Sequence, residues 1–218
     1  MTRPENASPP VPPGSLVLAS ASPRRRDILS RLGLDFEIHP ANIDESPRPG
    51  EAASELVVRL ALGKARTVAQ ALADGSGRWV LGSDTVVVLA GETLGKPRDP
   101  EDAEAMLGRL LGQTHRVLTG VAVVDARTGQ EFSRAVASDV IMRPGSEEEI
   151  RDYVAGGEPM DKAGAYALQG EGRRFVSQVV GSESNVIGLP VEETLALLEE
   201  AAAGGAARPG FAPPGGAE

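Results

Sequence analysis

The segment Trp79–Leu89, WVLGSDTVVVL, constrains the fold most, because its side chains are almost all apolar. A continuous apolar run is typical of a strand covered on both faces, whereas a half-exposed strand alternates polar and apolar residues. We therefore predict a central strand between two layers. Ser83 and Asp84 interrupt the run. An unpaired buried carboxylate is very costly, so Asp84 must be paired, bound to a metal or located at the strand's mouth. This makes Asp84 a candidate functional residue.

A second segment, Leu16–Asp27, is predicted to be a strand followed directly by a helix. Ser22 suits the N-cap and Pro23 the first helical position, with Arg24–Arg26 in the first turn. Free N–H groups, the helix dipole and guanidinium groups all favour a bound phosphate there. Without an anion, the three cations oppose the dipole. The alternative, an ordinary capped helix with solvated arginines, stays open from this segment alone.

The remaining patterns predict an α/β fold with a mixed sheet. Apolar spacing predicts a helix over Glu51–Ala73, with Lys64 inside the apolar stripe. Lys64 therefore either points into a polar cavity or extends to the rim of the buried face, and the pattern alone favours the rim. His115–Asp125 and Glu131–Met142 alternate around a turn and are predicted to form a β-hairpin. Strands and helices alternate through the rest of the chain.

Both ends of the chain differ from its middle in composition and in apolar periodicity. Residues 1–14 and 204–218 are rich in proline, glycine and alanine and lack apolar periodicity. We predict a disordered leader and a disordered tail around a folded domain over residues 15–203.

Composition limits the chemistry. The chain has no cysteine and only two histidines, His39 and His115, so a metal is predicted to be held by carboxylates, which favours Mg²⁺ or Mn²⁺. A net charge of -9 and an aromatic content of 3% argue against a nucleic-acid partner. The sequence has neither a long apolar run nor the apolar core of a signal peptide, which predicts a cytoplasmic protein without a membrane partner.

A series of short segments resembles, in order, the motifs of the Maf family of nucleoside triphosphate pyrophosphatases: LASASPRR, IDES, LALGKAR, GSDTVVVLAGETLGKP, GQTHRVLTGVAVV, EPMDKAGAYALQG and SNVIGLP. The resemblance implies an elongated, twisted mixed sheet flanked by helices, with a central active-site cleft, as in inosine triphosphate pyrophosphatases. It also implies cleavage of a nucleoside triphosphate between its α- and β-phosphates, dependence on a divalent cation, and a homodimer.

The resemblance assigns four residues to catalysis. Asp84 is implied as the proton acceptor that activates water, and Glu45 as the second acid. These two carboxylates are implied to hold Mg²⁺ or Mn²⁺. Lys64 and Lys96 are implied to neutralise charge on the phosphoryl oxygens, which favours the polar-cavity interpretation of Lys64.

The resemblance implies that a second group of residues binds the substrate. Ser20, Arg24 and Arg25 are expected to hold phosphates at the helix N-terminus. Thr85 and Gln169, with Arg24, resemble the specificity residues of family members that act on dTTP and UTP. A glutamine amide offers both a donor and an acceptor to a uracil or thymine edge. The expected substrates are dTTP and UTP, together with modified pyrimidines such as 5-methyl-UTP that a house-cleaning enzyme would remove.

Two alternatives remain. The family has been linked to inhibition of septum formation, so the chain could be a nucleotide-binding regulator of cell division with little turnover. A complete set of charged motif residues argues against a purely binding role. The second alternative is a pyrophosphatase acting on 7-methyl-GTP, against which Thr85 and Gln169 argue.

Overall fold

The computed structural model describes residues 11, 15–72 and 78–203. Within them, a seven-stranded mixed sheet has the order β2-β1-β3-β5-β6-β7, with β4 paired to β3. The strands β1, β2 and β3 are parallel, and all other pairs are antiparallel. The strands are β1 (Leu16–Leu18), β2 (Phe36–Ile38), β3 (Trp79–Leu89), β4 (Glu92–Leu94), β5 (Thr114–Asp125), β6 (Glu131–Met142) and β7 (Val176–Val180).

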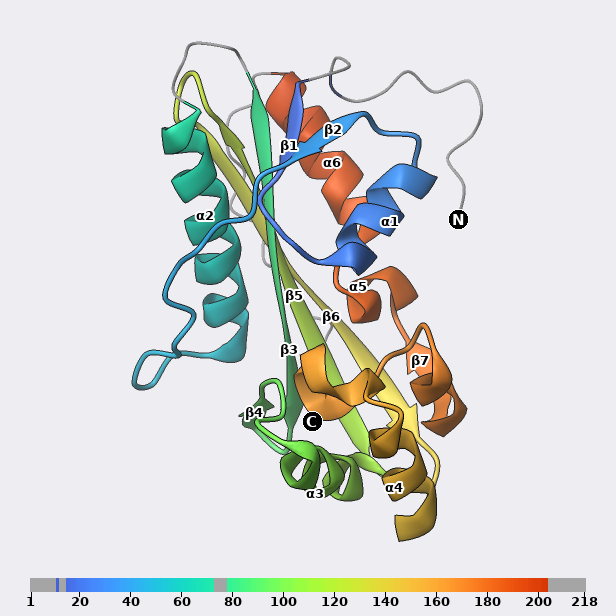
Figure 1. Ribbon diagram of the computed structural model, residues 1–218. Coiled ribbons are helices and arrows are strands. Elements are labelled where there is room, and N and C mark those ends of the chain that lie inside the picture. The colour runs from blue at the N-terminus through green and yellow to red at the C-terminus, as the bar shows by residue number, and fades with distance from the viewer. Residues whose placement is uncertain (1–10, 12–14, 73–77, 204–218) are drawn as a thin grey trace, which may run out of the picture.

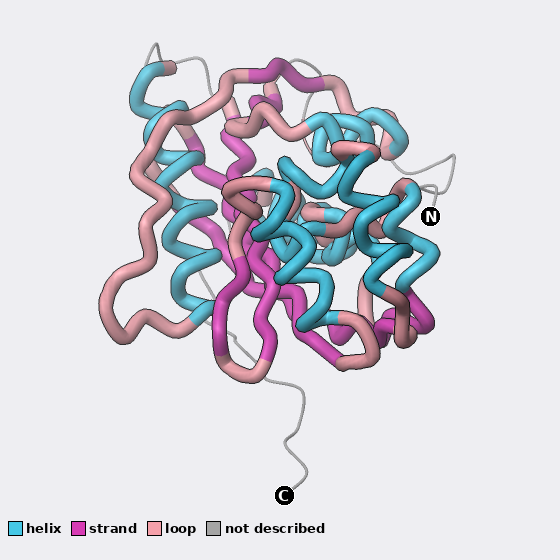
Figure 2. The backbone as a smooth tube through the Cα atoms, turned by 60° about the horizontal axis from the view of Figure 1, so that its bottom comes forward, coloured by secondary structure: helices cyan, strands magenta, loops and turns pink. Residues whose placement is uncertain are grey.

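Helices cover both faces of this sheet (Figure 1). In Figure 2, α2 stands on one side of the strands and most of the other helices gather on the other side. The α-helices are α1 (Pro23–Arg31), α2 (Ala53–Ala71), α3 (Pro100–Leu110), α4 (Glu147–Ala155), α5 (Glu183–Ile187) and α6 (Val191–Ala202). The 3₁₀ turns are η1 (Glu158–Asp161), η2 (Ala163–Ala165) and η3 (Glu171–Phe175).

Strand β3 is covered on both faces, as predicted. Val80 packs with the apolar stripe of α2, whereas its neighbour Leu81 packs with α1 and α6 on the opposite face. Successive side chains of a strand point to opposite faces, so both faces of a doubly covered strand must be apolar. The hairpin of β5 and β6 is also confirmed, and β5 pairs with β3 from Trp79 opposite Asp125 to Val88 opposite Arg116.

A separate apolar cluster closes the end of the sheet near α3 and α4. It joins β3, β5 and β6 to these helices through buried residues that include Val87, Leu107, Val140, Tyr153 and Phe175. The long strands therefore connect two apolar regions, one under α1 and α6 and one under α3 and α4.

Several boundaries differ from the sequence predictions. Helix α2 begins and ends two residues inside the predicted range, and Ala73 lies outside the described residues. Ser22 occupies the N-cap of α1, but its hydroxyl makes no capping bond. Its backbone N–H donates instead to Ser20 Oγ at 3.2 Å, so Ser20 closes the turn. The predicted tail and, except for Val11, the predicted leader lie outside the described residues. No helix in the described ranges is long and apolar enough to span a membrane.

His115 of β5 is a buried polar residue whose hydrogen-bonding partner, Tyr166, belongs to the apolar cluster near α3 and α4. Its Nε2 lies 2.8 Å from the hydroxyl of Tyr166, and the side chain is 2% exposed. Burial lowers the pKa of His115 to about 4, with the charge of Asp139 opposing that shift. The imidazole is therefore neutral in the folded protein at neutral pH.

The lowered pKa of His115 predicts that the folded protein loses stability in acid. The unfolded chain takes up this proton near its ordinary pKa, whereas the folded protein resists it, so the stabilising contribution is complete above that pKa and is lost as the pH falls toward 4. Between pH 7 and pH 5 we expect His115→Gln to reduce the acid-induced loss of unfolding free energy by about 2 kcal/mol. Urea unfolding at both pH values measures this effect. The exposed His39→Gln is the matched control, and an equal response of the two variants would contradict the prediction.

Candidate active site

A cleft of about 650 Å³ lies beside the middle of β3. Its walls come from the β1–α1 turn, the loop before α2, α2 itself, β3, the end of β4 and the segments 161–169 and 186–188. This size and this mixture of apolar walls with a few polar groups are typical of small-molecule sites. All predicted site residues line it: Ser20, Arg24, Arg25, Glu45, Lys64, Asp84, Thr85, Lys96 and Gln169.

Lys64 joins the two acidic residues of the cleft. Its Nζ lies 2.7 Å from Asp84 Oδ1 and 2.6 Å from Glu45 Oε1. Lys64 is 7% exposed, so its ammonium group points into the polar cleft and does not extend to the rim. Of the two interpretations that the sequence left for Lys64, the rim is therefore wrong. Two carboxylates at hydrogen-bond distance offset the cost of burying this charge.

Burial changes the acidity of Asp84. Desolvation raises the pKa of the Asp84 carboxyl, while the charges of Lys64 and Arg25 oppose that shift. Because a carboxylate with a raised pKa binds a proton more strongly, it is better suited to act as a general base near neutral pH. Asp84 pairs with Gly120 of β5 on one edge of β3, and on the other edge the stretches of β3 before and after it pair with β1 and β4, so its backbone is held in place.

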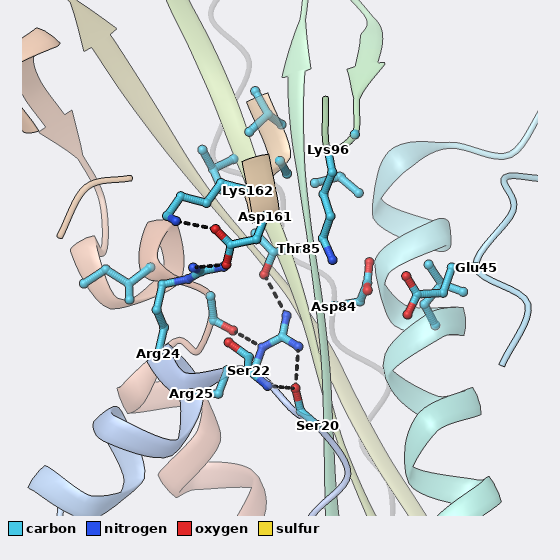
Figure 3. Close-up of a pocket in the computed structure, with 18 of the residues that line it drawn as sticks. Ser20, Ser22, Arg24, Arg25, Glu45, Asp84, Thr85, Lys96, Asp161 and Lys162 are labelled. Atoms are coloured by element: carbon cyan, nitrogen blue, oxygen red, sulfur yellow. Dashed lines mark hydrogen bonds and ion pairs between the residues drawn. The ribbon is translucent and has the colours of Figure 1, made fainter. Parts of the chain in front are cut away.

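Glu45 reaches the ammonium group of Lys64 from the loop before α2, which is bonded to that helix. Arg59 of α2 donates through Nη2 to the carbonyl of Ser46 at 3.0 Å and through Nε to Glu51 Oε1 at 2.5 Å. These bonds hold the loop against the helix that also carries Lys64. Figure 3 shows Glu45 pointing toward Asp84 from this side.

Arg25 is committed to protein contacts. It donates through Nε to Gly188 O at 2.9 Å, through Nη1 to Ser20 Oγ at 3.0 Å and through Nη2 to Thr85 Oγ1 at 3.3 Å (Figure 3). Burial lowers the pKa of Arg25, and the charge of Asp84 opposes this shift. Arg25 thus ties α1 to β3 and to the turn after α5, and its remaining N–H groups are left for a ligand.

The hydroxyl of Thr85 is part of a chain of hydrogen bonds. Thr119 Oγ1 donates to the carbonyl of Asn185 at 2.9 Å, and Thr85 Oγ1 lies 3.0 Å from Thr119 Oγ1. Since a hydroxyl has one proton to donate, Thr85 donates to Thr119 and accepts from Arg25. Thr85 therefore fixes Arg25 in addition to lining the cleft.

Arg24 faces the wall of the cleft that contains Asp161 and Lys162. Its Nη1 lies 3.1 Å from Asp161 Oδ2, and Asp161 also contacts Lys162 Nζ (Figure 3). Lys162 Nζ donates in addition to the carbonyl of Glu158 at 2.7 Å. Asp161 and Lys162 were not among the predicted site residues, although both belong to the EPMDKAGAYALQG segment. That segment contains the signal that could have identified them.

Two polar residues of the cleft remain available for a ligand. Among the described residues, neither the Lys96 ammonium nor the Gln169 amide has a hydrogen-bonding partner, and both residues are exposed. Lys96 extends into the cleft toward Asp84 in Figure 3. These two groups can therefore bind a ligand without first breaking an internal bond.

The carboxylates of Glu45 and Asp84 fit a hard divalent cation. Each has one oxygen bonded to Lys64, and its other oxygen has no partner in the described part of the chain. No group of three His, Cys, Asp or Glu residues that could hold a metal occurs within the described ranges. Magnesium commonly takes one or two carboxylates and fills its other positions with water and substrate phosphates. The donor set therefore suits Mg²⁺ or Mn²⁺ bound together with a phosphorylated ligand.

The fold and site define an α/β protein whose cleft combines an acid–lysine–acid centre with an arginine-bearing helix start, an arrangement suited to a phosphorylated ligand. The family model described as Maf-like protein matches residues 15–201, and the chain belongs to this family. The family and the mixed α/β fold therefore agree with the sequence resemblance.

Curated relatives are similar over most of the chain. A dTTP/UTP pyrophosphatase of Anaeromyxobacter sp. (strain Fw109-5) is 52% identical over 209 residues, which cover 91% of this chain and 98% of the relative. A protein of the same name from Myxococcus xanthus (strain DK1622) is 53% identical, covering 85% of this chain and 92% of the relative. Another, from Geobacter sulfurreducens, is 47% identical, covering 84% of this chain and 94% of the relative.

Proposed function

We propose that this protein hydrolyses dTTP and UTP between the α- and β-phosphates, giving a nucleoside monophosphate and pyrophosphate. The observation that carries the proposal is the buried Asp84 carboxylate, which lies in the cleft beside Lys64 and Glu45 and opposite the N-terminus of α1. The shared name of the curated relatives supports the same substrates.

In this mechanism Asp84 takes a proton from the attacking water. The water oxygen forms a bond to a phosphorus atom of the α–β anhydride, and that phosphorus loses its bond to the bridging oxygen. The bridging oxygen leaves with the other phosphate group. Lys64 and Lys96 neutralise negative charge on the phosphoryl oxygens, while Arg24, Ser20 and the N-terminus of α1 hold the phosphate chain. Positioning and charge stabilisation supply most of the catalysis in phosphoryl transfer.

Glu45 and Asp84 are the residues that would hold the divalent cation. When bound, Mg²⁺ or Mn²⁺ shields the phosphate charge and lowers the pKa of a bound water. Lys64 keeps the two carboxylates together in the protein without ligand and shares in balancing their charge.

Gln169 is proposed to read the base. Its amide offers both a donor and an acceptor to the edge of uracil or thymine. Gln169→Glu removes the donor and is expected to lower kcat/KM for dTTP and UTP by about 10- to 100-fold. Steady-state pyrophosphate release measures the change. The control is Gln178→Glu on the exposed part of β7, and unchanged turnover in Gln169→Glu would contradict the assignment.

The proposed activity is tested by pyrophosphate release from a panel of nucleoside triphosphates with Mg²⁺ or Mn²⁺. Selective release from dTTP and UTP is the expected result, and modified pyrimidines such as 5-methyl-UTP belong in the panel. Release mainly from 7-methyl-GTP would keep the mechanism but overturn the substrate assignment. No release from any nucleotide would favour the binding regulator. The homodimer and the cytoplasmic location stay predictions, which sedimentation and cell fractionation test.

A further inference from the structure

The segment around Gln169 is held by groups that the proposed mechanism does not use. Residues 164–168 are buried, and Gln169 is the first residue after them to be exposed. Gly170 follows with a φ of 144°, a backbone conformation that residues with a side chain rarely adopt. A short segment of this kind can present a side chain accurately only when its backbone is fixed on both sides.

Tyr153 of α4 fixes the side that precedes Gln169. Its hydroxyl accepts a hydrogen bond from the backbone N–H of Ala167 at 3.1 Å and donates to Glu158 Oε1 at 2.8 Å. The ring is 1% exposed and packs edge-on against Phe175, with ring centroids 5.4 Å apart. The hydroxyl therefore has a fixed position in the core.

Glu158 fixes the side that follows Gln169. Its Oε2 accepts from the backbone N–H of Glu171 at 3.1 Å, and its Oε1 accepts from that of Gly172 at 3.0 Å. Burial on its own would raise the pKa of Glu158, but these N–H groups and the Tyr153 hydroxyl hold the pKa below its usual value. Glu158 is therefore charged at neutral pH, and charge-assisted hydrogen bonds are the stronger kind.

Two glycines make the close approach possible. A Cβ at Gly170 would lie closer than 3.0 Å to the carboxylate of Glu158. A Cβ at Gly172 would lie 2.6 Å from the hydroxyl of Tyr153. The backbone on both sides of Gln169 thus rests directly on one connected pair of side chains.

We propose that Tyr153 and Glu158 are positioning residues that hold the backbone on both sides of Gln169 and so determine selectivity for the nucleobase. The inference rests on the proposed function, because it assumes that Gln169 contacts the base. Neither Tyr153 nor Glu158 lines the cleft, so both act through Gln169 and touch no reacting atom.

The test uses Glu158→Gln and Tyr153→Phe. A glutamine amide must place its NH₂ against at least one of the three donors that Glu158 accepts from. Tyr153→Phe removes only the hydroxyl and keeps the ring packing. The measurement is the ratio of kcat/KM for dTTP to that for dCTP. We expect each variant to lower the ratio about 10-fold or more, through a higher KM for dTTP, with kcat changed by less than about 3-fold.

Asp125→Asn is the matched control. Asp125 is a buried carboxylate that accepts from the backbone N–H groups of Arg127 and Thr128 in the turn between β5 and β6, away from the cleft. The substitution Asp125→Asn should lower the thermal midpoint without changing the ratio of kcat/KM for dTTP to that for dCTP. The inference is overturned if Glu158→Gln and Tyr153→Phe lower the midpoint but leave the ratio within about 2-fold of wild type. Failure of the proposed function would differ, because the wild-type protein itself would release no pyrophosphate, and both would then be overturned.

Discussion

Asp84→Asn is expected to lower kcat for pyrophosphate release from dTTP by about 10²- to 10⁴-fold. Asparagine has nearly the same shape as aspartate but cannot accept the proton of the attacking water. The change also removes one of the two carboxylates beside Lys64 and one of the two proposed metal ligands. These three effects act on the same step. Single-turnover release of pyrophosphate at saturating nucleotide and cation measures the loss.

The thermal midpoint of the variant shows whether the loss of turnover comes from the missing carboxylate or from unfolding. Lys64 keeps Glu45 as a partner in the variant, so we expect the thermal midpoint to stay within a few degrees of wild type. Asp139→Asn removes a carboxylate of similar charge from an exposed pair with Arg116 on the sheet and should leave turnover unchanged. Turnover close to wild type in Asp84→Asn would remove this residue from the mechanism.

Gly120→Ala is expected to destabilise the protein by about 2–4 kcal/mol. A Cβ at position 120 would lie closer than 3.0 Å to the backbone carbonyl of Val57 in α2. Backbone atoms of a packed helix cannot move aside as a flexible side chain can, so α2 would have to shift away from the sheet. Because α2 also carries Lys64, the same shift would displace the ammonium group from Asp84 and lower activity. Urea unfolding and pyrophosphate release on the same preparation measure both effects.

Gly108→Ala is the matched substitution. Gly108 is exposed within α3, and nothing lies within 4 Å of a Cβ built there. Alanine should stabilise this helix by about 0.5–1 kcal/mol. If both variants had similar stability, the close contact between α2 and the sheet would not be the cause, and the prediction for Gly120 would be wrong.

The fold was predictable where a pattern depends on neighbours in sequence. The apolar run of Trp79–Leu89 predicted a doubly covered strand because both faces of β3 need apolar side chains. The alternation in β5 and β6 predicted their hairpin, since those strands adjoin in the chain. The start of α1 was less predictable. Ser20 Oγ accepts hydrogen bonds from the backbone N–H of Ser22 and from Arg25, and neither bond follows from a local sequence pattern.

The residues that can do chemistry are recognisable from their neighbours in the chain: an acid in an apolar strand at Asp84, a lysine in an apolar stripe at Lys64 and arginines at a helix start. The partners of these groups, in contrast, follow from the packing of the folded chain. Arg24 and Arg25 are adjacent and chemically identical, yet Arg25 is tied to Ser20, Thr85 and Gly188, whereas Arg24 faces Asp161. Hydrogen bonds and ion pairs reach only about 3–4 Å, so partners that are distant in the chain are set by how the helices pack on the sheet.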